Sequence, residues 1–260
     1  VKDKDPLEFE GNIVRISPQP DMAAMLTRTG ISFLRENKEV GSTLINSIGM
    51  PFTSDNSFND EYVSGTKVQP IAFSGDLSRV FVAGAEGKIY VIDMLTFELI
   101  DAGLMGNPGV NITSLACVGS ALIIGEGNNY GGGAYSLMAM NINPASGEDY
   151  GQITSIDNDL GAHGVSGMAI GPDGTTLVVG IPGGRNSTNI AAKDDGKGKL
   201  KIYDLSTLTT GVSGGSIDNP VIVSLPEDGT GVVPQVISAT HDPDHFLVST
   251  VDDYNSGLLT

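Results

Sequence analysis

Tryptophan is absent from this sequence, cysteine occurs once, and basic residues are scarce. The 260 residues include 14 Lys and Arg against 31 Asp and Glu, which gives a formal net charge of −17. A surface this negative repels phosphate backbones and anionic lipid headgroups, so nucleic acid is disfavoured as a partner. The single cysteine, Cys117, excludes an intrachain disulfide. It leaves the redox compartment open, because large extracellular proteins also exist without cysteine.

Long apolar runs are missing as well. No stretch approaches the roughly 18 residues that span a bilayer, so we expect no transmembrane segment. Glycine, by contrast, is abundant at 35 residues, well above the usual share of about 7%. Short β-branched runs separated by glycine are typical of many strands joined by tight turns. The composition therefore predicts a large all-β chain with a hydrophobic core.

A repeat of two strands and a turn sets the predicted architecture. Residues 71–83 align without a gap with residues 168–180, and a third copy runs over residues 237–249. Each copy has an apolar strand, a polar turn with an aspartate at the same place, and a second apolar strand. A helical solenoid would instead need apolar residues at 3.6-residue spacing. The repeat indicates antiparallel strand pairs.

The following strand repeats too, because residues 87–96 match residues 198–207. A fourth apolar segment comes next, at residues 97–100 and 221–225. Four antiparallel strands in a recurring unit describe the blade of a β-propeller. The predicted fold class is thus all-β, a β-propeller of four-stranded antiparallel blades, with an incomplete set of blades within this chain.

The predicted units divide the chain after a flanking segment, or part of a preceding blade, at residues 1–20. They are residues 21–67, 68–110, 111–163, 164–233 and a partial unit at 234–260. The last unit stops inside its third strand. We therefore expect the natural polypeptide to continue past Thr260 and to begin before Val1.

Two stretches resemble known repeat families. Residues 71–100 look like the YVTN-type propeller repeats of microbial surface proteins. Residues 173–205 resemble the FG-GAP repeat of integrin-type propellers, whose second strand ends in a V-G-x-P-like turn. The sequence departs from these patterns in lacking a full D-x-D-x-D-G calcium loop, and the absence of tryptophan argues against WD40 blades. The resemblance implies a propeller protein of the cell surface or extracellular space.

One class of loop differs in length between the units. The loops between the second and third strands cover residues 84–87, 126–133 and 181–198. A constant scaffold with one variable class of loop indicates that this face carries the function. The segment 157–163, which enters the next unit, is predicted to lie on the same face.

Acidic residues on these loops predict a calcium site, since Ca²⁺ takes six to eight oxygen ligands. The candidate ligands are Asp157, Asp159, Asp194, Asp195, Asp252 and Asp253. The alternative is that these residues only form turns in which the side chain bonds a nearby amide. We expect that structural role for Asp93 and Asp204, which share one repeat position.

Two glycosylation sequons, at Asn111 and Asn186, point toward a secretory route. The leading hypothesis is a noncatalytic adhesion or binding module of an extracellular or cell-surface protein. It would engage a protein, glycan or cation through its loop-rich acidic face, with no catalytic residue and no cofactor other than Ca²⁺.

Two alternatives stay open. The first is a propeller enzyme, lactonase- or dehydrogenase-like, with a metal in the central funnel. It would need carboxylates or histidines on the inner strands, whereas residues 71–73, 115–117, 168–170 and 237–239 are small and apolar. The second is a structural subunit of a fibre or surface layer, assembled from copies of itself.

Overall fold

The structure is a computed structural model, and the residues that it describes are 11–16, 22–27, 30–35, 38–44, 71–84, 87–108, 110, 112–127, 134–161, 163–182, 198–206, 208, 217, 219–225 and 232–252. The described chain is all-β, as the composition predicts. Its strands form five antiparallel sheets, and one short 3-10 helix, Pro144–Asp149, joins two strands of the third sheet. None of the helices in the described ranges has the length and apolar character that a membrane crossing requires.

Four of the sheets have four strands each, paired in chain order. The first contains β1 (Gly11–Ile16), β2 (Met22–Thr27), β3 (Gly30–Arg35) and β4 (Lys38–Leu44). The second contains β5 (Ile71–Phe73), β6 (Arg79–Ala83), β7 (Lys88–Asp93) and β8 (Leu99–Met105). The third contains β9 (Ile112–Val118), β10 (Ala121–Glu126), β11 (Leu137–Asn141) and β12 (Ile153–Asp157).

The fourth sheet contains β13 (Gly167–Ile170), β14 (Thr176–Ile181), β15 (Lys199–Asp204) and β16 (Val221–Ser224). The fifth has two described strands, β17 (Val232–Ala239) and β18 (Phe246–Asp252). The predicted strand pairs of the repeat are therefore confirmed as β5–β6, β13–β14 and β17–β18. The repeated third strand is confirmed as β7 and β15.

The turn of the repeat shares two hydrogen bonds in all three copies. Its first amide donates across the turn to a carbonyl five residues later, from Ser74 to Arg79, from Gly171 to Thr176 and from Thr240 to His245. The aspartate between these residues accepts the amide two positions on in each copy. A shared side-chain bond to the turn backbone explains why an aspartate recurs there.

Several boundaries differ from the prediction by one to a few residues, among them the starts of two strands. The fourth strand of the second sheet begins at Leu99 rather than at Phe97. Phe97 has a φ of 58° and its amide donates to the carbonyl of Asp93, so it still belongs to the preceding turn. The first sheet begins at Gly11, within the segment that the sequence assigned to a flank or a preceding blade.

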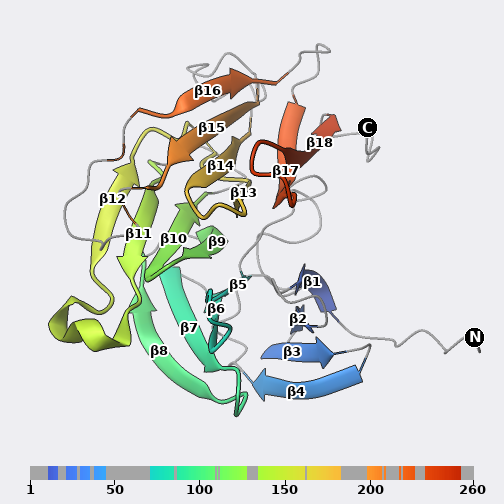
Figure 1. Ribbon diagram of the computed structural model, residues 1–260, viewed down its shortest axis with the longest axis vertical. Coiled ribbons are helices and arrows are strands. Elements are labelled where there is room, and N and C mark those ends of the chain that lie inside the picture. Colours follow the sequence, from blue (N-terminus) through green and yellow to red (C-terminus); the bar gives the residue numbers. More distant parts are fainter. Residues whose placement is uncertain are drawn as a thin grey trace, which may run out of the picture.

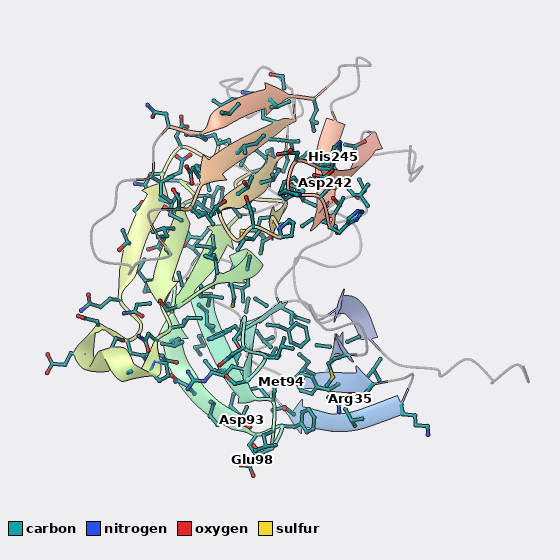
Figure 2. All side chains as sticks on the ribbon, viewed as in Figure 1. Arg35, Asp93, Met94, Glu98, Asp242 and His245 are labelled. Atoms are coloured by element: carbon teal, nitrogen blue, oxygen red, sulfur yellow. The ribbon has the colours of Figure 1, made fainter. Side chains whose placement is uncertain are left out.

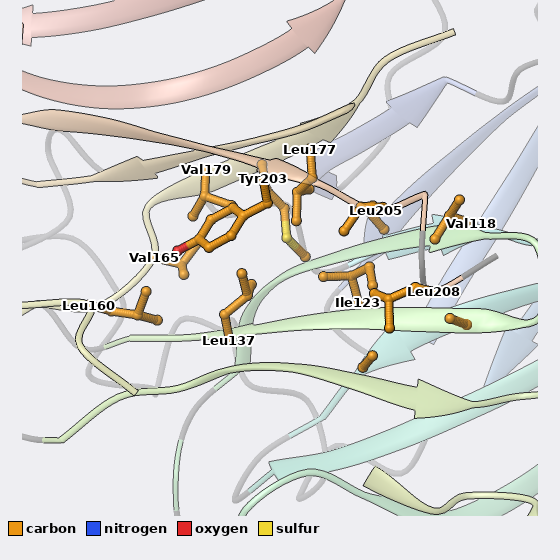
Figure 3. Packing of buried hydrophobic residues seen from close by; sticks show 14 of the residues in the cluster. Val118, Ile123, Leu137, Leu160, Val165, Leu177, Val179, Tyr203, Leu205 and Leu208 are labelled. Atoms are coloured by element: carbon orange, nitrogen blue, oxygen red, sulfur yellow. The ribbon is translucent and has the colours of Figure 1, made fainter. Parts of the chain in front are cut away.

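The hydrophobic core lies between consecutive sheets. One apolar cluster joins each neighbouring pair, from the first and second sheets through to the fourth and fifth. Figure 3 shows the cluster between the third and fourth sheets, where Tyr203, Leu177 and Val179 meet Ile123 and Leu137. The middle strands are buried on both faces, which explains why β10 and β14 read as continuous apolar runs.

The five sheets follow one another in an arc (Figure 1). The first strands, β5, β9, β13 and β17, lie toward the centre, whereas β8, β12 and β16 lie on the periphery. Contacts between β5 and β9, β9 and β13, and β13 and β17 connect the inner strands. The described sheets form an open arc and not a closed ring.

Candidate functional site at the loop end of the sheets

The loops after the second strands meet the links between sheets at one end of the strands. The amide of Gly106 donates to the carbonyl of Gly87, and the amide of Val165 donates to that of Glu126. In the fourth sheet the ammonium group of Lys201 bonds the carbonyl oxygen of Asp159. We call this the loop end. It is the face on which the sequence placed the functional loops.

An ion pair between the third and fourth sheets is the most connected polar group of the loop end. The Nζ of Lys201 donates to Oδ2 of Asp157 at 2.9 Å, and their side chains are 11% and 13% exposed. The hydroxyl of Tyr203 donates to the same oxygen at 2.6 Å. The other carboxylate oxygen of Asp157 accepts the amide of Asp159 at 2.7 Å.

These contacts fix the protonation states of the Asp157 carboxyl and the Tyr203 phenol. Burial raises the pKa of Asp157, but bonds from Tyr203, from the Asp159 amide and from Lys201 outweigh it, so the pKa is lowered. Burial and the adjacent carboxylate raise the pKa of Tyr203. The carboxylate is therefore ionised and the phenol protonated at neutral pH. Their chemistry fits a clamp between two sheets.

Glu126, the last residue of β10, is fully buried at the same end. Its Oε2 accepts the amide of Ser136 at 3.0 Å, whereas Oε1 has no hydrogen-bond partner among the described residues. Burial raises the pKa of this carboxyl, and the neighbouring Asn107 and the Ser136 amide stabilise its charged form and offset part of the rise. A buried carboxyl with one unpaired oxygen favours the protonated form.

A third polar group lies at the outer edge of the loop end. The amide oxygen of Asn158 accepts the hydroxyls of Ser136 at 3.0 Å and Ser155 at 2.9 Å. These bonds fix the start of the segment that enters the fourth sheet. The described polar side chains of the loop end thus bond one another and order the backbone there.

The aspartates shared by the third-strand ends confirm the structural role expected for them. Oδ1 of Asp93 accepts the amides of Leu95 and Thr96, and Oδ1 of Asp204 accepts the amide of Ser206. These backbone bonds lower the pKa of both carboxyls. Figure 2 shows Asp93 in its turn, close to Met94 and Glu98.

The structure places three of the predicted calcium ligands. Asp157 and Asp159 lie together, bonded to each other and to Lys201. Asp252 ends β18, so it belongs to the fifth sheet, whereas Asp157 ends β12 in the third. The other candidates, Asp194, Asp195 and Asp253, and the sequon residues Asn111 and Asn186, lie outside the described residues.

Across the ranges that the structure describes, no three His, Cys, Asp or Glu residues gather closely enough to hold a metal ion. The calcium site stays a prediction that depends on the long loops.

A scan of the chain against models of protein families finds no match, and a search of curated proteins finds none.

Sequence reasoning missed two residues of the loop end. Lys201 interrupts an apolar strand at the repeat position that Tyr90 occupies in the second sheet. Glu126 ends an apolar run at the start of a loop, where a solvated side chain is the usual expectation. A charged residue inside a buried strand is a signal for a partner in the neighbouring sheet, and Asp157 is that partner.

Proposed function

We propose that this chain is a run of β-propeller blades and works as a noncatalytic binding or structural module of a secreted or surface protein. It engages a protein, a glycan or a cation through the loop end. One observation carries the proposal: the strand framework recurs from sheet to sheet, whereas the second-to-third loops grow from 84–87 to 127–136 and 182–198. Residues that vary on a rigid scaffold are where binding usually resides.

The described polar groups of the scaffold support this division of labour. Asp76, Asp173 and Asp242 order one class of turn, and Asp157 with Lys201 joins two sheets. Because these side chains already bond the backbone of turns or a neighbouring sheet, we infer that residues of the loops bind the partner.

The net charge of the chain favours partners that carry positive charge. A net charge of −17 attracts cations and basic surfaces, and it raises the rate of encounter with them at low ionic strength. Calcium coordinated by loop carboxylates and a lysine-rich protein surface are the two chemistries that the charge favours.

The test compares the chain with a variant in which residues 128–134 and 183–197 are each replaced by the sequence of residues 84–87, so that the buried Tyr135 and the bonds of Ser136 are kept. Calcium binding is measured by calorimetry, and binding of a glycan panel and a lysine-rich peptide by surface plasmon resonance. We expect at least one probe to bind the parent chain and to be lost from the variant, while both melt cooperatively.

The matched control exchanges the turn at residues 74–79 for that at residues 171–176, which lies at the other end of the sheets. This control is expected to keep full binding. A parent chain that binds none of the three probes, or a loop-shortened variant that keeps its affinity, contradicts the proposal.

A further inference from the structure

Glu126 places a carboxyl at a position of the repeat where the fourth sheet has an apolar residue. Strands β10 and β14 align at Gly125 and Gly180, whose carbonyl oxygens each accept a side-chain hydroxyl. Glu126 therefore corresponds to Ile181, which is buried in the cluster between the third and fourth sheets. Glu126 is itself 0% exposed. Since isoleucine serves at the equivalent position, the packing of the sheets does not require a carboxyl there.

The carboxyl of Glu126 faces the second sheet. Ile124, two positions earlier on β10, belongs to the apolar cluster between the second and third sheets, and side chains two positions apart on a strand share a face. Asn107, in the link between these sheets, lies beside the carboxyl and stabilises its charged form. Among the described residues Oε1 has no hydrogen-bond partner. The charged form thus leaves one buried oxygen unpaired.

The backbone of Glu126 joins three segments of the loop end. Its amide donates to the carbonyl of Ser136 at 3.1 Å, and its carbonyl accepts the amide of Val165 at 2.8 Å. Its Oε2 accepts the amide of Ser136 at 3.0 Å. Beyond it, Gly127 forms an isolated bridge with Gly164. Bonds at the end of a strand pair can open while the rest of the sheet stays folded.

Few titratable groups surround this carboxyl. The described residues of the adjoining segments, 106–108, 110, 112–113, 134–137 and 163–165, include no Asp, Glu, Lys or Arg. Tyr135 and His163 are the titratable residues among them, and Tyr135 packs in the cluster on the opposite face of the third sheet. In the second sheet, Lys88 is exposed and points to the face of β7 opposite the buried Ile89. His163 is therefore the group that an experiment must separate from Glu126.

We propose that Glu126 is a proton-operated switch at the loop end. With its carboxyl neutral, the bonds to Ser136 and Val165 hold this end of the third sheet closed. Loss of the proton to solvent leaves a carboxylate with one unpaired oxygen in an apolar surrounding, and breaking these terminal bonds admits water to it. The inference deepens the proposed function, on which its consequence for binding rests: the base of the loop end is ordered in acid and opens at alkaline pH.

Amide hydrogen exchange of the full chain, followed residue by residue, tests the switch without any ligand. After correction for intrinsic exchange rates, protection of the Glu126, Ser136 and Val165 amides should be constant below the ordinary pKa of a glutamate carboxyl. Above it we expect a fall of about tenfold per pH unit, because opening is linked to one proton. The fall ends once the pH exceeds the raised pKa of the closed state. The Gly171 amide, bonded to the carbonyl of Thr176 at the other end of the sheets, should keep constant protection.

Two variants remove the proton and differ in polarity. Glu126→Gln keeps the shape and an acceptor oxygen but cannot ionise, so its protection should stay at the level that the parent shows in acid. Glu126→Ile introduces the residue of the repeat and should also give a profile that does not change with pH. It carries the test if the glutamine variant fails to fold. The matched control, His163→Gln, should keep the profile of the parent.

The consequence for binding has its own measurement. Any probe that binds the loop end should lose affinity with rising pH more steeply in the parent than in Glu126→Gln, because an ordered base lowers the entropic cost of binding. Equal pH profiles of affinity would contradict this regulation.

Three exchange results would overturn the switch itself. They are a profile of the parent that does not change with pH, the same fall in either Glu126 variant, and loss of the fall in His163→Gln. The last would assign the effect to the histidine. Since exchange is measured without a probe, absence of loop-end binding leaves this test intact, and the two proposals fail separately.

Discussion

At the residue scale, one turn position has a left-handed backbone in two of the three copies of the repeat, whereas the third copy has Pro243 there, which cannot adopt it. Gly174 has a φ of 70° in the fourth sheet, and Leu77 holds the aligned position in the second with a φ of 58°. Side chains beyond glycine adopt this region at a cost of about 1 kcal/mol. Leu77 adopts this conformation while its side chain packs on the apolar cluster between the first and second sheets.

We therefore expect Gly174→Ala to lower the free energy of unfolding by about 1 kcal/mol in urea titrations. The nearest atom to an added Cβ there is 3.9 Å away, so backbone conformation alone causes the loss. Gly75→Ala is the control, since its Cβ would meet nothing within 4 Å and its φ is not positive. Equal losses in both variants would contradict the turn geometry.

The turn aspartates predict a dependence of stability on acid. Bonds from Thr175 and Thr176 lower the pKa of Asp173 from 3.8 to about 2. A lowered pKa in the folded state means that the stabilisation is present above pH 3.8 and is lost as the pH falls toward 2. Asp173→Ala should thus destabilise at pH 7 by about 1 kcal/mol, and less at pH 2.

Thermal melts of both proteins across this range measure that difference. A gap between parent and variant that stays constant from pH 7 to pH 2 would show that the carboxylate does not hold the turn.

Glu126 predicts the opposite dependence. Burial raises its pKa in the folded state, so its contribution is most favourable below the unfolded pKa and is lost as the pH rises through the folded one. We expect the parent chain to lose stability between mildly acidic and alkaline pH. Glutamine cannot ionise, so the Glu126→Gln variant should lose less stability over this pH range than the parent chain, by about 1 kcal/mol. Parallel pH profiles of the two proteins would contradict this.

At the scale of elements, the clamp between β12 and β15 is expected to act as a pair. Removing one charge of a buried ion pair leaves the other without compensation, at about 3 kcal/mol or more. Lys201→Met alone should therefore cost more than Lys201→Met combined with Asp157→Asn. A double-mutant cycle in urea measures the coupling, and strictly additive losses would show that the two groups do not interact.

The sequence predicts the inner strands of the sheets better than the outer ones. β5, β6, β13 and β14 are buried on both faces, so they read as short apolar runs around a shared turn. β1 was assigned outside its sheet, because the turn between β1 and β2 does not match the turn of the repeat, and so the sequence did not show that the two strands pair. The start of β8 was placed two residues early, because the left-handed Phe97 is invisible in an apolar pattern.

The candidate site was less predictable for a physical reason. The aspartates that order turns act on amides two or three residues away, and so Asp93 and Asp204 could be assigned from sequence. The partner of Lys201 lies 44 residues away along the chain, in another sheet. Such contacts depend on how two sheets stack, which no local pattern encodes.

At the scale of the whole molecule, one unit of antiparallel strands is used repeatedly. Each sheet buries its neighbour's face, so stability comes from nearest-neighbour interfaces as in other repeat proteins. β16 gains little from these interfaces, since all four of its residues are exposed. Its outer position and its uncovered face leave its amides less protected than those of the inner strands.

Hydrogen exchange followed strand by strand in the isolated chain tests this claim most directly. We expect strong and similar protection for β5–β6, β9–β10 and β13–β14, lost together on denaturation, with β16 exchanging much faster. Protection confined to one of these three pairs, or β16 as slow as β14, would contradict a framework of equivalent stacked sheets.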